Sequence, residues 1–273
     1  MSYAALMVYV EADGTPEDRV RVSASLADKF NAVLIGLSAL AIRPPLVAEG
    51  DVVEHVVEAD LKEITTKLAR QASWFRRIVD SDHRKREWRP VFEFPNDALA
   101  REARAADLVV IGRTAGPGDQ YSSLNPGEAI LRMGRPTLVV PEGVRSLRAD
   151  HVIIGWKDTR EARRAVQDSL PFLHGAGRVT IAAICGSGER KAALEHMSDV
   201  GCYLEWHRVK VGSKIMQEQK GSSAAQLIQL AQDEKADLLV TGAYGHSRLG
   251  EWMFGGMTHD LLATSPICCL MSH

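Results

Sequence analysis

The sequence lacks the features that mark membrane proteins, secreted proteins and nucleic-acid-binding proteins. Its 273 residues contain no apolar run that approaches the roughly 20 residues of a membrane helix. The net charge of −2 provides no electrostatic basis for binding nucleic acid or a membrane surface. The first ten residues have no basic segment of the kind that opens a signal peptide. We therefore expect a cytoplasmic protein without nucleic-acid or membrane partners.

The cysteine spacing argues against a metal or redox motif. The four cysteines are Cys185, Cys202, Cys268 and Cys269, and no two of them have C-x-x-C spacing. Cys268 and Cys269 are adjacent in an apolar run, so on a strand their side chains would point to opposite faces. We expect all four to be buried, reduced thiols that pack as small apolar residues.

The chain contains an internal repeat with an offset of 130 residues. Two apolar segments recur at this offset: Ala106–Gly112 as Ala236–Gly242, and Arg135–Val140 as Ser265–Leu270. The repeat predicts two domains, residues 1–143 and residues 148–273, joined by a short turn-like segment. Each domain ends in an apolar strand at the end of its sheet, and such edges tend to be paired or covered. Whether two chains also form a homodimer is left open.

Apolar runs alternate with helical periodicity in both copies, which predicts a doubly wound parallel sheet of five strands in each. In the first copy the pattern places strands near 3–10, 32–39, 88–94 and 108–112, and helices near 16–30, 51–79 and 97–105. In the second copy Thr159 is a good N-cap for a helix. There we expect a helix over 189–200, the third strand over 203–209 and a polar loop over 211–221.

A glycine-bearing loop lies between a strand and a helix near the end of the second copy. Its spacing is Gly242-x2-Gly245-x9-Gly255. Glycine lets the backbone approach a ligand closely, and a helix that begins after the loop directs free N–H groups toward it. The loop therefore predicts a phosphate site, the alternative being that these glycines only form a turn and cap a helix.

This spacing resembles the nucleotide-binding loop of the universal stress protein family, and the repeat resembles a tandem member of that family. The resemblance implies the adenine nucleotide alpha hydrolase-like fold, with strand order 3-2-1-4-5 in each copy. It implies as well that the two copies pair with each other within the chain. It also implies an adenine nucleotide, ATP or AMP with or without Mg²⁺, as the ligand of the second copy. The implied binding residues are Gly242, Gly245, Gly255, Gly256, Met257, Thr258 and Asp158.

The chain departs from the family pattern in both copies. Gly256 stands where a serine or threonine usually follows the last glycine, so Thr258 is the nearest hydroxyl. Lys157 stands where an aspartate is usual, with Asp158 one residue late. In the first copy Pro126 removes an N–H donor and Glu128 places a carboxylate near the equivalent site. We therefore expect that the first copy has lost phosphate binding.

No general base, nucleophile or set of metal ligands stands near the loop in the sequence. We expect a regulatory stress-response protein with little or no catalysis, at most slow hydrolysis of ATP. The alternative is a ligand-free interaction module with the same fold. An ATP pyrophosphatase would need a phosphate loop such as S-G-G-x-D-S after its first strand, and the sequence has none.

Overall fold

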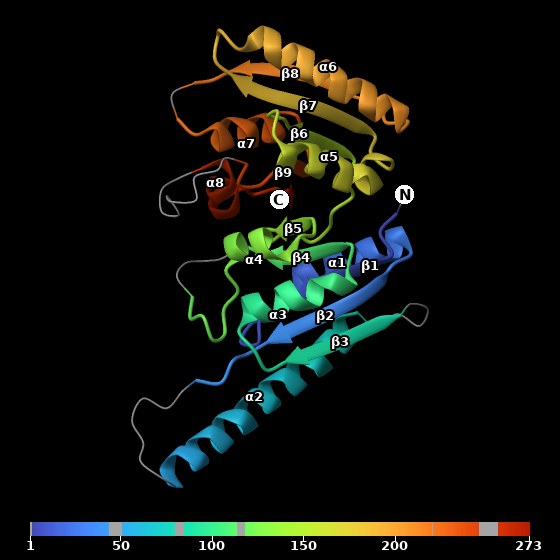
Figure 1. The fold of residues 1–273 in the computed structure, drawn as a ribbon. Coiled ribbons are helices and arrows are strands. Elements are labelled where there is room, and N and C mark those ends of the chain that lie inside the picture. The colour runs from blue at the N-terminus through green and yellow to red at the C-terminus, as the bar shows by residue number, and fades with distance from the viewer. Residues whose placement is uncertain (1, 44–50, 80–84, 114–117, 220, 246–255) are drawn as a thin grey trace.

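The computed structural model describes residues 2–43, 51–79, 85–113, 118–219, 221–245 and 256–273. Its centre is one ten-stranded sheet with the strand order β3-β2-β1-β4-β5-β10-β9-β6-β7-β8, covered by helices on both faces (Figure 1). None of the described helices is both long enough and apolar enough to span a membrane.

The first half of the chain forms one side of this sheet. Its strands are β1 (Ala5–Tyr9), β2 (Val33–Ala39), β3 (Arg86–Val91), β4 (Leu108–Gly112) and β5 (Thr137–Val140). Its helices are α1 (Glu17–Phe30), α2 (Asp51–Ile78), α3 (Pro95–Glu102), the 3-10 turn Ala103–Ala105 and α4 (Pro126–Met133). All neighbouring strands are parallel, so the predicted order 3-2-1-4-5 is confirmed for this half.

The second half repeats the arrangement. Its strands are β6 (His151–Gly155), β7 (Arg178–Cys185), β8 (Gly212–Gln217), β9 (Leu238–Gly242) and β10 (Cys268–Ser272). Its helices are α5 (Arg160–Leu173), α6 (Arg190–Trp206), α7 (Ser223–Asp233) and α8 (Met257–Thr264). Buried side chains of α1, α2, α5 and α6 form one apolar cluster and those of α3, α4, α7 and α8 another, one for each face of the sheet.

The third strand of the second half is not where the sequence pattern placed it. The segment expected as a strand, residues 203–209, begins inside α6, which turns Met197 and Leu204 onto the sheet at helical spacing. The strand is β8, a largely exposed and polar edge strand inside the segment expected as a loop. Because an edge strand outside the core needs no apolar run, its sequence gave no strand signal.

The two halves join through their last strands. β5 and β10 pair in antiparallel fashion, with Leu138 opposite Leu270 and Val139 opposite Cys269. All other pairs in the sheet are parallel, so the joint makes one mixed sheet from two parallel units. The pairing satisfies the backbone groups of two strands that would otherwise be open edges.

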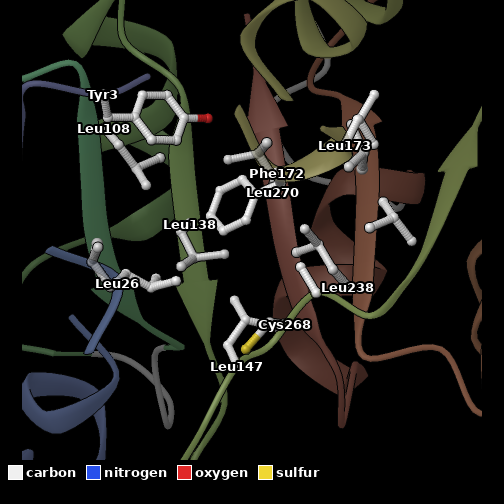
Figure 2. Packing of buried hydrophobic residues seen from close by; sticks show 14 of the residues in the cluster. Tyr3, Leu26, Leu108, Leu138, Leu147, Phe172, Leu173, Leu238, Cys268 and Leu270 are labelled. Atoms are coloured by element: carbon white, nitrogen blue, oxygen red, sulfur yellow. The ribbon is translucent and has the colours of Figure 1, made fainter. Parts of the chain in front are cut away.

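An aromatic cluster of Tyr3, Phe30 and Phe172 packs between the halves on the face covered by α1 and α5. The three rings meet edge to face, with centroids 5.0 to 5.7 Å apart. Figure 2 shows this region together with Leu138 from β5 and Leu270 from β10. Because Phe172 comes from the second half and its two partners from the first, this packing holds the halves together across the strand joint.

Three of the four cysteines are buried, as predicted, but Cys202 is exposed. It lies on α6, which directs few side chains to the core. The prediction failed because it assigned burial by residue type rather than by helix face.

Candidate functional site

The candidate site lies at the carboxyl ends of β6 and β9, where α5 and α8 begin. Gly242 ends β9, and α8 begins after Gly256. Gly255, with the rest of 246–255, lies outside the described residues. The described part of the loop is therefore its two ends.

The start of the loop is pressed against the N-terminus of α5. A Cβ at Gly242 would lie 2.6 Å from the backbone nitrogen of Ala162, and one at Gly245 would lie 2.9 Å from Oε2 of Glu161 and 3.2 Å from Oγ1 of Thr159. Gly242 has no room for a side chain against this backbone, and a side chain at Gly245 would require the Glu161 carboxylate to move. The sequence analysis expected these glycines to let the backbone approach a ligand. In the structure they let it approach the N-terminus of α5, which the glycine spacing alone does not reveal.

The end of the loop is fixed by Thr258. Its Oγ1 accepts a hydrogen bond of 3.1 Å from the backbone N–H of Tyr244, and the residue is only 8% exposed. Tyr244 itself has a φ of 57°, in the left-handed region. Thr258 therefore ties the two ends of the loop together, and its hydroxyl proton can still be donated. Gly256 and Met257 bring their backbone N–H groups to the start of α8.

A buried carboxylate that the sequence analysis missed stands beside the loop. Glu161, in the first turn of α5, is 3% exposed and accepts a hydrogen bond from Nε of Arg160. Burial acts to raise its pKa, but hydrogen bonds from Arg160, from its own backbone N–H and from Thr159 outweigh burial and lower the pKa. Glu161 is therefore negatively charged at neutral pH, next to Gly245. An acidic residue two positions after a predicted N-cap was the signal that could have revealed it.

Thr159 caps α5 as predicted, because its Oγ1 accepts from the backbone N–H of Ala162 at 3.2 Å. Asp158, in contrast, contacts side chains of α5 and α6 rather than the glycine loop. Its Oδ1 accepts from Nη2 of Arg163 at 2.6 Å, and its Oδ2 lies 3.9 Å from Nδ1 of His196 on α6. The contacts described for Asp158 thus direct its carboxylate toward a groove between α5 and α6.

In the first half, Gly112 ends β4 as Gly242 ends β9, and a positively charged side chain lies against it. The guanidinium of Arg19 lies against Gly112, where a Cβ would collide with it, and it is paired with Glu11. Glu128 instead extends along α4 to Arg132, with 2.7 Å between Oε1 and Nη1. Loss of phosphate binding in this half remains a prediction, but the charged side chain that lies against Gly112 is Arg19 rather than Glu128.

The loop of the second half also touches the first half. The hydroxyl of Tyr244 lies over Gly127 at the start of α4, so close that a Cβ at Gly127 would collide with it. Arg113, which follows β4, donates to the backbone oxygen of Ala263 in α8 at 3.1 Å. The ends of both loops are therefore part of the contact between the halves. Within the described ranges, no three His, Cys, Asp or Glu side chains are grouped so that they could hold a metal ion.

We compared the chain with protein-family models, curated proteins and solved structures. The model of the universal stress protein family matches residues 183–273. No curated protein matches the sequence. Among solved structures, a universal stress protein from Archaeoglobus fulgidus DSM 4304 is 14% identical with a TM-score of 0.71, over 98% of this chain and 97% of its own. A putative universal stress protein from Pseudomonas aeruginosa UCBPP-PA14 is 12% identical with a TM-score of 0.57, over 99% and 93%.

The sheet and its covering helices have the adenine nucleotide alpha hydrolase-like fold, once in each half. Residues 183–273 match the universal stress protein family, and the whole chain is similar in fold to solved universal stress proteins, with that fold present twice.

Proposed function

We propose that this chain is a regulatory stress-response protein that acts in the cytoplasm and binds an adenine nucleotide, ATP or AMP, through its second domain. The domains are residues 1–143 and 148–273, paired through β5 and β10. The observation that carries the proposal is the convergence of two helix N-termini on one loop at the carboxyl ends of parallel strands. Thr159 and Glu161 bring α5 to Gly245, and Thr258 holds the start of α8 to Tyr244. Helix N-termini at such a point attract phosphate groups.

In this proposal the backbone at the two loop ends binds the phosphates. Gly242 and Gly245 provide the close approach, Gly256 and Met257 provide N–H groups, and Thr258 donates its hydroxyl proton. Gly255 belongs to the same set by its place in the motif. Asp158, which faces the groove beside α6, contributes at most from outside the loop. We expect little or no hydrolysis.

The charge of Glu161 sets the conditions for binding. A phosphate held near Gly245 would lie roughly 5 Å from this carboxylate, where two unit charges repel by about 3 kcal/mol at an effective dielectric constant of ~20. Mg²⁺ bound to the phosphates offsets this repulsion, because it prefers carboxylate and phosphate oxygens. We therefore expect Mg²⁺–ATP to bind more tightly than free ATP.

The same carboxylate also favours a second candidate function. Glu161 occupies the N-terminus of α5 in one half, and Arg19 fills the equivalent crevice in the other. If Glu161 and Arg19 exclude phosphate from these two positions, neither half binds a nucleotide. The chain is then a ligand-free interaction module in which the paired halves serve as a scaffold. A measurement of nucleotide binding separates the two functions.

The experiment is calorimetric titration of the full chain with ATP and AMP, with and without Mg²⁺. We expect a dissociation constant below about 1 mM for Mg²⁺–ATP, since a site with several backbone donors exceeds the −4 kcal/mol that this value represents. Gly256→Asp adds a carboxylate at the start of α8, where a Cβ meets nothing within 4 Å, and should weaken binding at least tenfold. Gly188→Asp is the matched control, because a Cβ at Gly188 meets nothing within 4 Å. No binding of either nucleotide to the folded wild-type chain would leave the scaffold function.

A further inference from the structure

The second half of the chain ends the sheet with an open strand edge. β8 is the last strand in the order, and its neighbour among the described strands is β7 alone (Figure 1). Glu218, directly after β8, donates its backbone N–H to the oxygen of Cys185 on β7 at 2.9 Å. Because the direction of these groups alternates along a strand, Ser213 and Ile215 direct their backbone N–H and C=O groups away from β7. Such a row of groups is a template for pairing with another strand.

The opposite end of the sheet is guarded against this pairing. There the backbone N–H of Leu40 donates to the oxygen of Val91 at 3.1 Å, so the same alternation turns Pro90 of β3 outward. Proline has no N–H and interrupts an edge. β8 contains no proline, and the one charged residue in it, Lys214, is already paired with Glu234 at 2.8 Å. The edge at β8 therefore remains fit for pairing.

α6 turns one side toward this edge. Met197 and Leu204 face the sheet. The α6 residues that line the groove toward α5 are His196, Asp199, Val200 and Tyr203. At about 3.6 residues per turn, the side opposite this groove carries five residues, which we call the outer stripe: Lys191, Leu194, Ser198, Cys202 and Glu205. Gly201, beside the stripe, would bring a Cβ within 4.0 Å of Val211, which precedes β8, so the stripe lies on the β8 side of α6.

The outer stripe is complementary to a second copy of itself. All five side chains are exposed, including 49% of Leu194. Lys191 and Glu205 stand seven residues before and after Ser198, and Leu194 and Cys202 stand four before and after it. Within the described part of the chain, neither Lys191 nor Glu205 forms an ion pair. Two antiparallel copies would therefore set each lysine beside a glutamate and each leucine beside a cysteine, as a two-fold contact requires.

The neighbouring charges of α6 agree with this arrangement. Arg190 is exposed next to Lys191 and adds to the positive end of the stripe, which meets the negative end of the other copy. Asp199 lies on the groove toward α5, and Glu195 lies on the solvent side of the helix, so neither carboxylate is part of the stripe.

Continuing the sheet across the edge would bring two outer stripes into contact. Paired strands lie about 4.8 Å apart, so a two-fold axis would lie about 2.4 Å beyond β8. α6 lies over β7 and β8, roughly 5 Å from that axis. The two α6 helices would then be about 10 Å apart, a usual distance between packed helices. The chain joins its own halves in the same manner, with β5 and β10 antiparallel and α4 against α8.

We propose that two copies of this chain associate through the edge of β8 and the outer stripe of α6, antiparallel about a two-fold axis near Ser198. The strand edge supplies backbone hydrogen bonds, and the stripe fixes the alignment by its charges. The proposal does not require that the glycine loop binds a nucleotide.

The first test is sedimentation equilibrium of the full-length protein. We expect a dimer with a dissociation constant of about 10 to 100 µM, because the contact is small. Dilute protein is then monomeric and its Cys202 reacts freely. Leu194→Asp should weaken association at least tenfold, since it places a carboxylate in the apolar part of the stripe. Leu61→Asp, at a comparably exposed leucine of α2, is the matched control and should change association less than twofold.

A charge exchange tests the alignment. Lys191→Glu and Glu205→Lys each replace two attractions by two repulsions, and each should weaken association about tenfold. The double variant restores both pairs with reversed sign and should return to within threefold of the wild type. Independent damage to the fold would add in the double variant instead of cancelling.

A cross-link tests the axis. In a Cys202→Ser background the remaining native cysteines are buried. Ser198→Cys then places one thiol of each copy at the axis, and diamide should oxidise the pair to a disulfide-linked dimer. Ser73→Cys, an exposed serine of α2, is the matched control and should cross-link at least tenfold more slowly. A wild type that stays monomeric at about 300 µM, a dimer that Leu194→Asp leaves intact, a double charge variant no better than the single ones, or equal cross-linking at Ser198→Cys and Ser73→Cys would each overturn the proposal.

Discussion

Replacing Glu161 with glutamine removes one buried negative charge from the N-terminus of α5 and nearly preserves the shape of the side chain. The carboxylate lies beside the backbone of Gly245, within contact distance of the position that a Cβ would take there. Its pKa is lowered, so above the ordinary range of carboxyl titration the wild type carries the charge and the variant does not. The substitution therefore tests whether this charge controls anion binding at the loop.

The expected size follows from the geometry. At roughly 5 Å the repulsion of one phosphate charge is about 3 kcal/mol, or about 100-fold in the dissociation constant, and counterions and solvent reduce it. We expect Glu161→Gln to bind ATP about 10-fold to 100-fold more tightly than the wild type in the absence of Mg²⁺. The gain should be smaller with Mg²⁺, because the cation already offsets the repulsion.

The assay is calorimetric titration with ATP at neutral pH, in the presence and absence of Mg²⁺. Glu195→Gln, on an exposed position of α6, makes the same change in net charge and should alter the affinity less than twofold. Thermal unfolding checks the fold, because loss of the charge at the helix N-terminus costs about 0.3–1 kcal/mol of stability. If Glu161→Gln binds ATP no better than the wild type, the charge of Glu161 does not govern this loop and the reasoning is wrong.

Two further predictions concern packing and thiol chemistry. Phe172→Ala, which removes one ring of the aromatic cluster between the halves, should lower the free energy of unfolding by about 3–5 kcal/mol in urea titration; a loss under 1 kcal/mol would show that this cluster does not hold the joint. Burial raises the pKa of Cys268 to about 12 and that of Cys269 to about 11. Ellman's reagent at pH 8 should therefore modify Cys202 rapidly in the native protein and the other three cysteines only after unfolding, and prompt reaction of two or more thiols would contradict the assigned burial.

The pattern of apolar and polar residues was enough to predict the strands and helices whose side chains face a core. The run from Leu238 to Gly242 and its copy from Leu108 to Gly112 are buried central strands, and such strands need continuous apolar residues. Thr159 was recognisable as an N-cap because capping is a property of adjacent residues. β8 was not recognisable, because an exposed edge strand places no demand on its side chains.

The sequence by itself determined the duplication and the place of the glycine loop, because each depends on the order of neighbouring residues. The strand order of each half came only from the resemblance to the universal stress protein family. Only the tertiary structure decided that β5 and β10 join the halves into one sheet. It alone set Glu161 beside Gly245 and Arg19 against Gly112. These contacts unite residues far apart in the chain, and their distances follow from how the helices pack on the sheet, which no local pattern encodes.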